Sequence, residues 1–144
     1  MLSFNYYIPI QIRYGDLDPQ WHVNNSRFLT FIEQARFSYL MALGLFDGES
    51  YLDFELIVAD VHIAFLAPIK LEQKVRIGTR VARIGNKSLT FEYLIEDENT
   101  GQALATAETV MVAYDYHAQT SKPVSPLWRS KISAFEGLPA GPQT

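Results

Sequence analysis

The segment from Asn25 to about Leu43 most constrains the fold, because apolar side chains recur along it at spacings of three and four residues. The apolar positions are Phe28, Leu29, Ile32, Ala35, Phe37, Tyr39, Leu40 and Leu43. They fall nearly all round the predicted helix, so the helix should be mostly buried. Asn24 or Asn25 suits its N-cap, and Gly44 suits its end.

The second half of the chain predicts β-strands, because apolar residues alternate with other residues between short turns. Strands are expected at Ile57–Ala67, Val75–Val81, Leu89–Ile95 and Ala103–Tyr116. A further strand is expected before the helix, from Tyr6 to Tyr14. Gly85-Asn86 and Asn99-Thr100-Gly101 are turn signals. One buried helix and about five antiparallel strands indicate an α+β fold in which a sheet wraps around a helix.

Length and composition exclude several classes of protein. The 144 residues suit one domain, residues 1–144, with a short closing helix at about 126–136. A net charge of -4 leaves no basic surplus for nucleic acid. The chain has no cysteine and three scattered histidines, so we expect no disulfide, thiol nucleophile or metal site. No apolar run approaches the roughly 20 residues of a membrane span, so we expect a cytoplasmic protein.

Asp18 gives the best indication of chemistry, because it lies in a loop between a predicted strand and the long helix. A carboxylate in this position faces the unpaired N–H groups of the helix N-terminus, which can polarise a carbonyl. A carboxylate and such donors together suffice for attack on an activated acyl group. The alternative interpretation is that Asp18 only caps the loop or the helix.

Several segments of this chain follow one another as in a known family. They are Tyr14-Gly15-Asp16-Leu17-Asp18-Pro19, His22-Val23-Asn24-Asn25, Glu33-Gln34-Ala35-Arg36, Val58-Ala59-Asp60-Val61, Phe65-Leu66-Ala67-Pro68, Lys87-Ser88-Leu89-Thr90-Phe91 and Ala105-Thr106-Ala107. In these segments the chain resembles the 4-hydroxybenzoyl-CoA thioesterase-like proteins of hotdog fold. The resemblance implies a long central helix wrapped by a five-stranded antiparallel sheet.

The resemblance also implies roles for individual residues. Asp18 would attack the thioester carbonyl or activate a water, and the backbone N–H of Asn25 would polarise the thioester oxygen. His22 would orient Asp18 or a water, or else be a structural loop residue. The residues expected to contact the substrate are Asn24, Asp60, Lys87 and Ser88. A related branch of the superfamily has its carboxylate on the helix, at the position of Glu33, although Glu33 could instead pair with Arg36 or with a second subunit.

The predicted activity is therefore hydrolysis of an acyl-CoA to a free acid and CoA, with an acyl carrier protein thioester as another possible substrate. Coenzyme A enters as part of the substrate, and no separate cofactor is expected. Two alternatives stay open, namely a hotdog-fold hydratase or dehydratase and an acyl-CoA-binding module without turnover. The hydratase motif has an Asn where this chain has Asp18, and the binding module has little use for that carboxylate. Phe28, Phe31 and Tyr39 could line an acyl site or belong to the core.

A homodimer, or a tetramer built as a dimer of dimers, is expected because a long apolar edge strand needs cover. The strand from Ile57 to Ala67 is nearly free of charge, Asp60 excepted. By the resemblance, this strand pairs with its copy in a second subunit, and each active site draws on both chains. Asp18 of one subunit would then face Asp60 or the Lys87 hairpin of the other.

Overall fold

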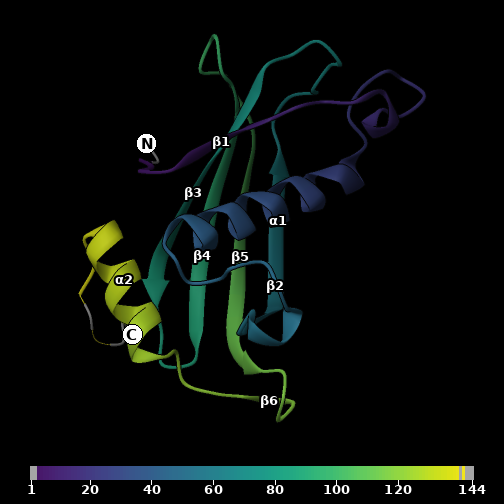
Figure 1. Ribbon diagram of the computed structural model, residues 1–144. Helices are drawn as coiled ribbons and strands as arrows, with labels where there is room; N and C mark the ends of the chain where they lie inside the picture. The colour runs from purple at the N-terminus through teal and green to yellow at the C-terminus, as the bar shows by residue number, and fades with distance from the viewer. Residues whose placement is uncertain (1–2, 140, 142–144) are drawn as a thin grey trace.

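The computed structural model describes residues 3–139 and 141. The elements follow in the order β1 (Tyr7–Ile10), η1 (Tyr14–Asp16), α1 (Asn25–Ala42), η2 (Tyr51–Asp53), β2 (Leu56–Phe65), β3 (Val75–Ile84), β4 (Ser88–Asp97), β5 (Ala103–Asp115), β6 (Thr120–Ser121) and α2 (Pro126–Glu136). The η elements are short 3-10 helices. The strands form an antiparallel sheet in the order β1-β3-β4-β5-β2, and β6 pairs with β5 (Figure 1).

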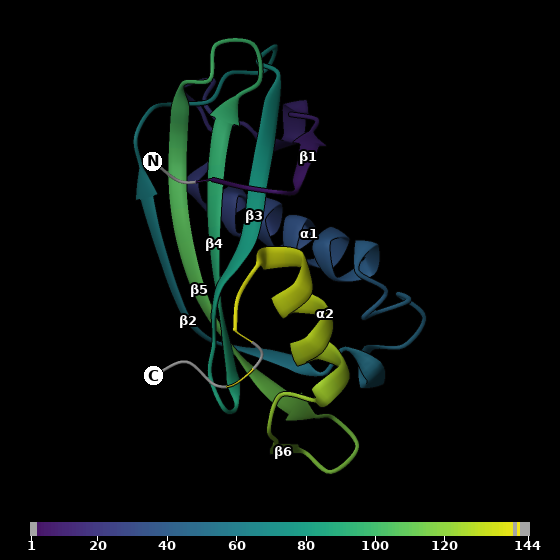
Figure 2. The ribbon, with the colours of Figure 1, turned by 90° about the vertical axis from the view of Figure 1, so that its left-hand side faces the viewer.

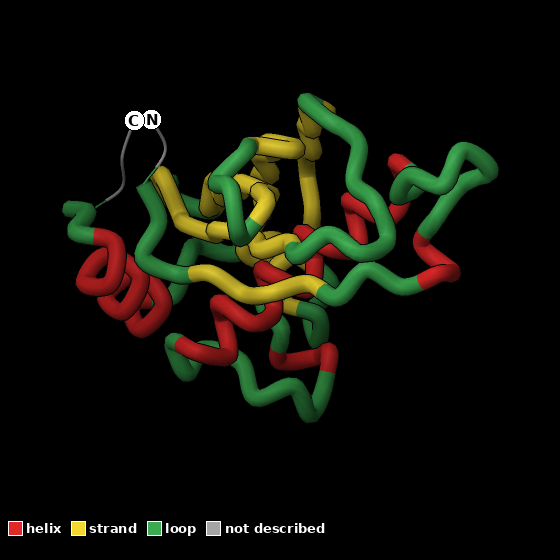
Figure 3. The backbone as a smooth tube through the Cα atoms, turned by 90° about the horizontal axis from the view of Figure 1, so that it is seen from above, coloured by secondary structure: helices red, strands yellow, loops and turns green. Residues whose placement is uncertain are grey.

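Both α-helices lie on the same side of the sheet, and the sheet curls until β1 lies beside α1 (Figure 2). Seen from above, the strands curl about α1, and α2 lies to one side (Figure 3). The predicted α+β fold with a sheet around a central helix is therefore confirmed. Four of the strands are long, with ten residues in β2, β3 and β4 and thirteen in β5. The other two, β1 and β6, have four and two residues.

Helix α1 has the predicted limits because its caps are local in sequence. The Asn24 side chain accepts a hydrogen bond from the Ser26 N–H at 3.0 Å, and Gly44 follows the helix at a φ of 71°. A positive φ of this kind favours glycine and ends the helix. Phe28, Phe31 and Tyr39 are at most 5% exposed. These three aromatic residues belong to the hydrophobic core. None of the helices in the described part of the chain is long and apolar enough to cross a membrane.

The first strand is shorter than predicted. It ends at Ile10, whereas the apolar alternation extended to Tyr14, whose side chain is 73% exposed in η1. The chain turns because the N–H of Arg13 donates to the Asp16 carboxylate and the N–H of Asp16 donates to the Arg13 carbonyl, both at 2.9 Å. Alternation along a sequence cannot detect such a turn, since the turn depends on one buried carboxylate.

Helix α2 is held to both α1 and the sheet by its last residue. Glu136 accepts hydrogen bonds from the Tyr39 hydroxyl at 2.5 Å and from the Val81 N–H at 3.0 Å. Burial, helped by the Glu136 carboxylate, raises the pKa of Tyr39 far above its usual value. Trp128 of α2 is 4% exposed, so the helix completes the core. Its limits agree with the prediction of 126–136, with Ser125 as its N-cap.

Strand β2 forms one border of the sheet, and its outer side pairs with no strand in the part of the chain that the structure describes. Its apolar side chains are unusually exposed, with 41% for Ile57, 45% for Val58, 40% for Val61 and 48% for Phe65. An apolar edge strand of this length is a surface that proteins ordinarily cover or pair.

Candidate active site

The loop between β1 and α1 is closed on itself by backbone contacts. Leu17 and Val23 form an isolated antiparallel bridge, and the Asp18 N–H donates to the His22 carbonyl at 2.7 Å. The Trp21 N–H donates to the Asp18 carbonyl at 3.0 Å, closing a turn that begins with Asp and Pro. These residue types favour the first two positions of a β-turn. The loop is therefore a compact platform for Asp18, with the Trp21 side chain 61% exposed at its tip.

The two oxygens of the half-buried Asp18 carboxylate have different surroundings. Oδ1 accepts hydrogen bonds from the Gln20 N–H at 2.9 Å and from the His22 N–H at 3.1 Å. Within residues 3–139 and 141, no hydrogen-bond donor is found for Oδ2. Two backbone donors thus fix the orientation of the carboxylate and leave one oxygen available for reaction.

Asp18 faces a cleft of about 320 Å³ between its loop, the start of α1 and the segment that follows β2. This cleft, called the Asp18 cleft, also contains His22, Asn25, Phe28, Phe65 and Leu66. The structure therefore brings Asp18, His22 and Asn25 together, as expected. Phe65 and Leu66 were not predicted as site residues, although the resemblance included their segment. On its other side, Asp18 borders a hollow of about 380 Å³ next to Trp21.

The backbone N–H of Asn25 is the first of α1, and the first four N–H groups of a helix have no intrahelical acceptor. The Asn24 side chain occupies the N–H of Ser26 and not that of Asn25. No acceptor for the Asn25 N–H is found in the described chain. The Asp18 cleft therefore combines an oriented carboxylate with a residue whose backbone donor is available to an oxygen atom.

Asp16 has a structural role in the turn that precedes Asp18. Its side chain is 5% exposed, accepts from the Arg13 N–H and lies 3.6 Å from Arg27 Nε. Its carbonyl also accepts from the Asn24 N–H at 2.8 Å. Asp16 thus joins the loop to the start of α1 and does not line the Asp18 cleft.

The four residues expected to contact substrate lie outside the Asp18 cleft of their own subunit. Asn24 caps α1, and Asp60 is an exposed residue of β2. Lys87 and Ser88 belong to the β3–β4 hairpin, where Ser88 pairs with Val112 near the end of β5. The Asp18 cleft instead contains Phe65, which pairs with Ala105 near the start of β5. The hairpin and the cleft therefore lie at opposite ends of the sheet.

Glu33 and Arg36 do not form the pair that was considered for them, and no ion pair to Glu33 is found in residues 3–139 and 141. Arg36 turns towards the sheet, is 4% exposed and donates from Nη1 to the Tyr93 hydroxyl at 3.1 Å. Burial raises the pKa of Tyr93, against the effect of this cation. Glu33 is exposed at the wall of a different cavity.

This second cavity, called the apolar cavity, has a volume of about 680 Å³. It lies between α1 and the connection from α1 to β2, with Phe37, Met41, Phe46, Tyr51, Phe54 and Tyr116 in its wall. Sequence reasoning missed it, because its residues come from three separate segments. The only signal was the aromatic content of the segment from Phe46 to Phe54.

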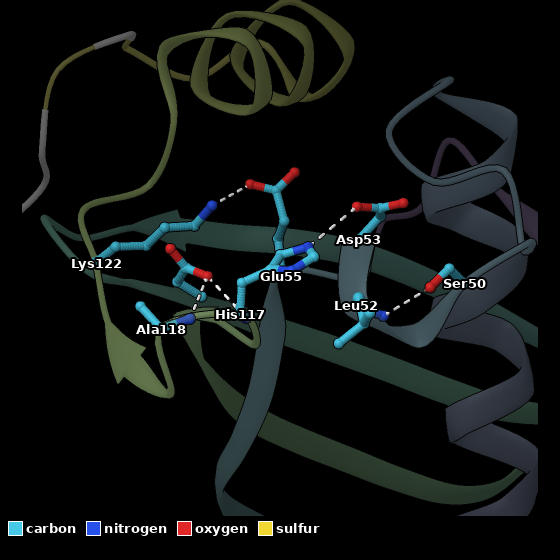
Figure 4. A network of polar contacts seen from close by, with 8 residues as sticks. Ser50, Leu52, Asp53, Glu55, His117, Ala118 and Lys122 are labelled. Carbon is cyan, nitrogen blue, oxygen red and sulfur yellow. Dashed lines mark hydrogen bonds and ion pairs between the residues drawn. The ribbon is translucent and has the colours of Figure 1, made fainter.

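The outer wall of the apolar cavity is tied to the β5–β6 hairpin (Figure 4). Lys122 forms an ion pair with Glu55, and His117 Nε2 lies 3.9 Å from Asp53 Oδ1. The Ser50 side chain caps η2 by accepting from the Leu52 N–H at 3.2 Å. The first two contacts join the connection between α1 and β2 to the hairpin.

Comparison with known proteins identifies the family. Residues 12–132 match the family model of the thioesterase-like superfamily. The chain belongs to this superfamily. It is 28% identical to the long-chain acyl-CoA thioesterase FadM of Escherichia coli strain K12 over 123 residues, which cover 85% of this chain and 93% of FadM. It is 25% identical to the acyl-CoA thioesterase YbgC of Haemophilus influenzae over 115 residues, covering 78% and 84% of the two chains.

A solved structure supports the same assignment for this member of the superfamily. The thioesterase from Thermus thermophilus, crystallised with coenzyme A and Zn, has a TM-score of 0.83 and 30% identity. The match covers 96% of this chain and 99% of that one. The predicted hotdog fold is thereby confirmed, and so is the prediction that the chain is a thioester hydrolase.

Proposed function

We propose that this hydrolase is an acyl-CoA thioesterase in which Asp18 is the catalytic carboxylate. The observation that carries the proposal is that the two carboxylate oxygens of Asp18 have different surroundings. Oδ1 is held by two backbone N–H groups, and Oδ2 has no partner in the described chain and can react in the cleft. The names of FadM and YbgC support coenzyme A as the carrier of the acyl group. An acyl carrier protein thioester is the second candidate substrate.

In the proposed reaction the thioester carbonyl oxygen accepts a hydrogen bond from the Asn25 N–H. Asp18 Oδ2 takes a proton from a water that attacks the carbonyl carbon, or attacks that carbon itself to form an anhydride that water then opens. In both routes the C–S bond breaks, the thiolate takes up a proton, and a free acid and CoA are released. One oxyanion donor contributes about 3 kcal/mol to such a step. These roles require no resident cofactor.

The proposed enzyme is a single-domain homodimer, or a dimer of such dimers, joined through β2. Two features of β2 support this assembly. Its apolar side chains are exposed, and its outer side pairs with no strand of the described residues. A two-fold contact of this kind would bury an obligate-type area, above about 2,000 Å². Asp60, Lys87 and Ser88 are proposed to reach the substrate from the second subunit, where Lys87 would meet the CoA phosphates. Asn24 would contact the substrate from the same α1 N-terminus as Asn25.

The proposal is tested by replacing Asp18 with Asn, which keeps the shape and removes the base or nucleophile. We expect kcat for the best acyl-CoA to fall by at least about 100-fold. Asp115→Asn is the matched control, because Asp115 Oδ1 likewise accepts two loop N–H groups, from His117 at 2.9 Å and Ala118 at 3.0 Å. The control should keep its kcat within about threefold, since Asp115 lies outside the Asp18 cleft.

The wild-type protein is assayed first on saturated, unsaturated and aromatic acyl-CoAs. Release of free CoA supports a thioesterase, whereas addition of water to a 2-enoyl-CoA without CoA release would indicate a hydratase. Tight binding of acyl-CoA without any turnover would indicate a binding module. Near-normal turnover by folded Asp18→Asn protein would exclude Asp18 and direct attention to Glu33.

A further inference from the structure

We infer that Tyr14 and Trp21 form an aromatic shelf that binds the pantetheine arm of the thioester, the neutral segment between the sulfur and the phosphate of the carrier. The shelf lies beside Asp18 of the same subunit. The inference rests on the proposed thioesterase function and adds a binding surface for one part of the substrate. Coenzyme A and an acyl carrier protein have this arm in common.

The two rings of the aromatic shelf lie at the surface and not in the core. They meet edge to face with centroids 5.9 Å apart, and 73% of Tyr14 and 61% of Trp21 is exposed. Large aromatic side chains ordinarily stabilise a protein through burial, and these two contribute little in that way. Because neighbouring exposed apolar groups mark binding surfaces, a pair of such rings beside Asp18 indicates a place for a ligand.

The backbone of Trp21 gives a second reason to assign a binding role to this residue. Its φ is 64°, in the left-handed region that favours glycine. Its N–H donates to the Asp18 carbonyl at 3.0 Å, a contact that glycine would make equally well. The indole side chain therefore makes the turn less favourable without adding a backbone contact. Residues held in such conformations concentrate at ligand-binding and active sites.

The Tyr14 side of the aromatic shelf is braced by Arg27 of α1. Nη2 of Arg27 donates to the Gly15 carbonyl at 3.3 Å, and its Nε lies 3.6 Å from the Asp16 carboxylate. Both contacts fix η1, which carries Tyr14, against the first turn of α1. The aromatic shelf is therefore positioned before a substrate arrives, so binding need not order the loop.

The hollow beside the aromatic shelf selects among the parts of the substrate by charge and exposure. Its described lining includes the Asp18 carboxylate but no Lys or Arg, so it does not suit phosphates, which require basic partners. An alkyl chain would leave much of its surface in water on rings as exposed as these. The pantetheine arm alternates amides with methylene and methyl groups, so one side can pack on the rings while the other stays hydrated.

The order of groups along the substrate agrees with this assignment. Asp18 lines both the Asp18 cleft and the hollow, so a thioester with its carbonyl carbon at Asp18 can pass its sulfur side into the hollow. The pantetheine arm is the first segment beyond the sulfur, and the phosphates and the adenine ring follow it. The arm therefore reaches the aromatic shelf first, and the phosphates remain available to Lys87.

The aromatic shelf is tested with Trp21→Gly, which removes one ring and suits the backbone. The substrates carry the acyl group that the wild type hydrolyses best, on CoA, 4′-phosphopantetheine, pantetheine or N-acetylcysteamine. For the first three we expect kcat/KM to fall about five- to tenfold through a higher KM, the range for one lost aromatic contact. N-acetylcysteamine lacks most of the arm, so its thioester should change by less than about twofold. The same acyl group on an acyl carrier protein identifies the preferred carrier.

The matched control is Gln119→Gly, because Gln119 is an exposed residue with a φ of 57° in the turn between β5 and β6. It makes the same backbone change away from the hollow, so its kinetics should stay at wild-type values on every substrate. Trp21→Phe keeps a ring and should restore most of the loss. The Tm of Trp21→Gly should not fall, since glycine suits the left-handed conformation.

Three results would overturn the inference. An equal loss on all thioesters, including that of N-acetylcysteamine, would mean that Trp21 acts on the acyl side or through Asp18. A loss confined to CoA thioesters would assign the aromatic shelf to the adenine ring. Unchanged kinetics of Trp21→Gly on every substrate would show that the ring does not contact the substrate.

Binding of CoA itself separates the inference from the proposed function. CoA and adenosine 3′,5′-bisphosphate, a nucleotide fragment without the arm, are titrated by calorimetry into wild-type and Trp21→Gly protein. We expect the Kd of CoA to rise about five- to tenfold in the variant and that of the bisphosphate to stay unchanged. This difference in a wild type that hydrolyses no thioester would refute the proposed function and keep the aromatic shelf. Equal CoA binding by both proteins, with an active wild type, would refute the shelf and keep the function.

Discussion

The two borders of the sheet differ in how the protein ends them. Strand β1 has four residues, contains Pro9, which offers no N–H, and curls towards α1. Strand β2 has ten residues, and its exposed apolar side chains project from both faces. The chain itself curls to cover the β1 border, whereas the outer side of β2 pairs with no strand of the described residues. The Asp18 cleft lies beside the incomplete border, so assembly and activity should depend on each other.

The largest effect that tests this comparison is expected from a charge placed on β2. Val61→Glu should convert a dimer into a species of 16.4 kDa in sedimentation at micromolar concentration, because a carboxylate cannot be buried unpaired in an apolar contact. Activity should fall with the dimer, by at least about 100-fold, since the proposed active site uses residues of both subunits.

The matched control for Val61→Glu is Tyr7→Glu on the other border. The two positions have similar exposure, 40% for Val61 and 36% for Tyr7. The β1 variant should keep the wild-type mass and activity, because Tyr7 lies at the border that the chain covers itself. A wild-type protein that sediments as an active monomer would refute both the β2 interface and the shared site.

A smaller effect is expected for His22 in the Asp18 cleft. Its backbone N–H and carbonyl hold Asp18, and its side chain makes no hydrogen bond in the described residues. His22→Ala preserves the backbone contacts, so we expect kcat to fall by less than about tenfold while Tm falls. Loss of a general acid or base costs roughly 100-fold or more. A decrease of that size in kcat with an unchanged Tm would make His22 a catalytic or positioning residue.

The smallest effect concerns Asp97, the last residue of β4, where the chain turns towards β5. Its Oδ1 accepts from the Asn99 and Thr100 N–H groups at 2.8 and 2.9 Å, and Gln73 Nε2 donates to Oδ2 at 2.9 Å. These bonds, chiefly the one from Gln73, hold the pKa of Asp97 below its usual value. A lowered pKa in the folded state stabilises the fold above the unfolded pKa of about 3.9, and this stabilisation is lost as pH falls through the folded pKa.

Asp97→Asn should therefore have a lower Tm than wild type at neutral pH, with a difference that disappears as pH falls below about 4. Its kcat should stay unchanged, in contrast to Asp18→Asn. Thermal melts across this pH range measure the difference, and Glu98→Gln, at an exposed carboxylate in the same turn, is the control. A Tm difference that grows in acid would contradict the assigned hydrogen bonds.

The helices could be predicted from the sequence because their limits are set by neighbouring residues. Asn24 and Gly44 bound α1, and Ser125 and Gly137 bound α2. The end of β1 could not be predicted, because it depends on a turn around the buried Asp16. The alternating pattern of β2 predicted a strand and its lack of charge predicted an apolar edge, and both agree with its place at the border of the sheet.

In the candidate site, too, residues close in sequence could be predicted and residues brought together by the fold could not. Asp18, His22 and Asn25 are close in sequence, so a loop followed by a helix was enough to place them together. The apolar cavity joins Phe37, Phe54 and Tyr116, which meet only after β2 has paired with β5. No local pattern contains that pairing, so the apolar cavity could be found only in the folded structure.

The chain has two tryptophans, and they lie in opposite environments. Trp21 is 61% exposed beside Asp18 and meets Tyr14 edge to face at 5.9 Å, whereas Trp128 of α2 is 4% exposed in the core. Indole emission depends on the polarity around the ring, so the two residues provide separate optical signals. Trp128→Phe protein would report ligand arrival through Trp21, and Trp21→Phe protein would report unfolding through Trp128. Occupancy of the site and integrity of the core can thus be followed in one molecule without an added dye.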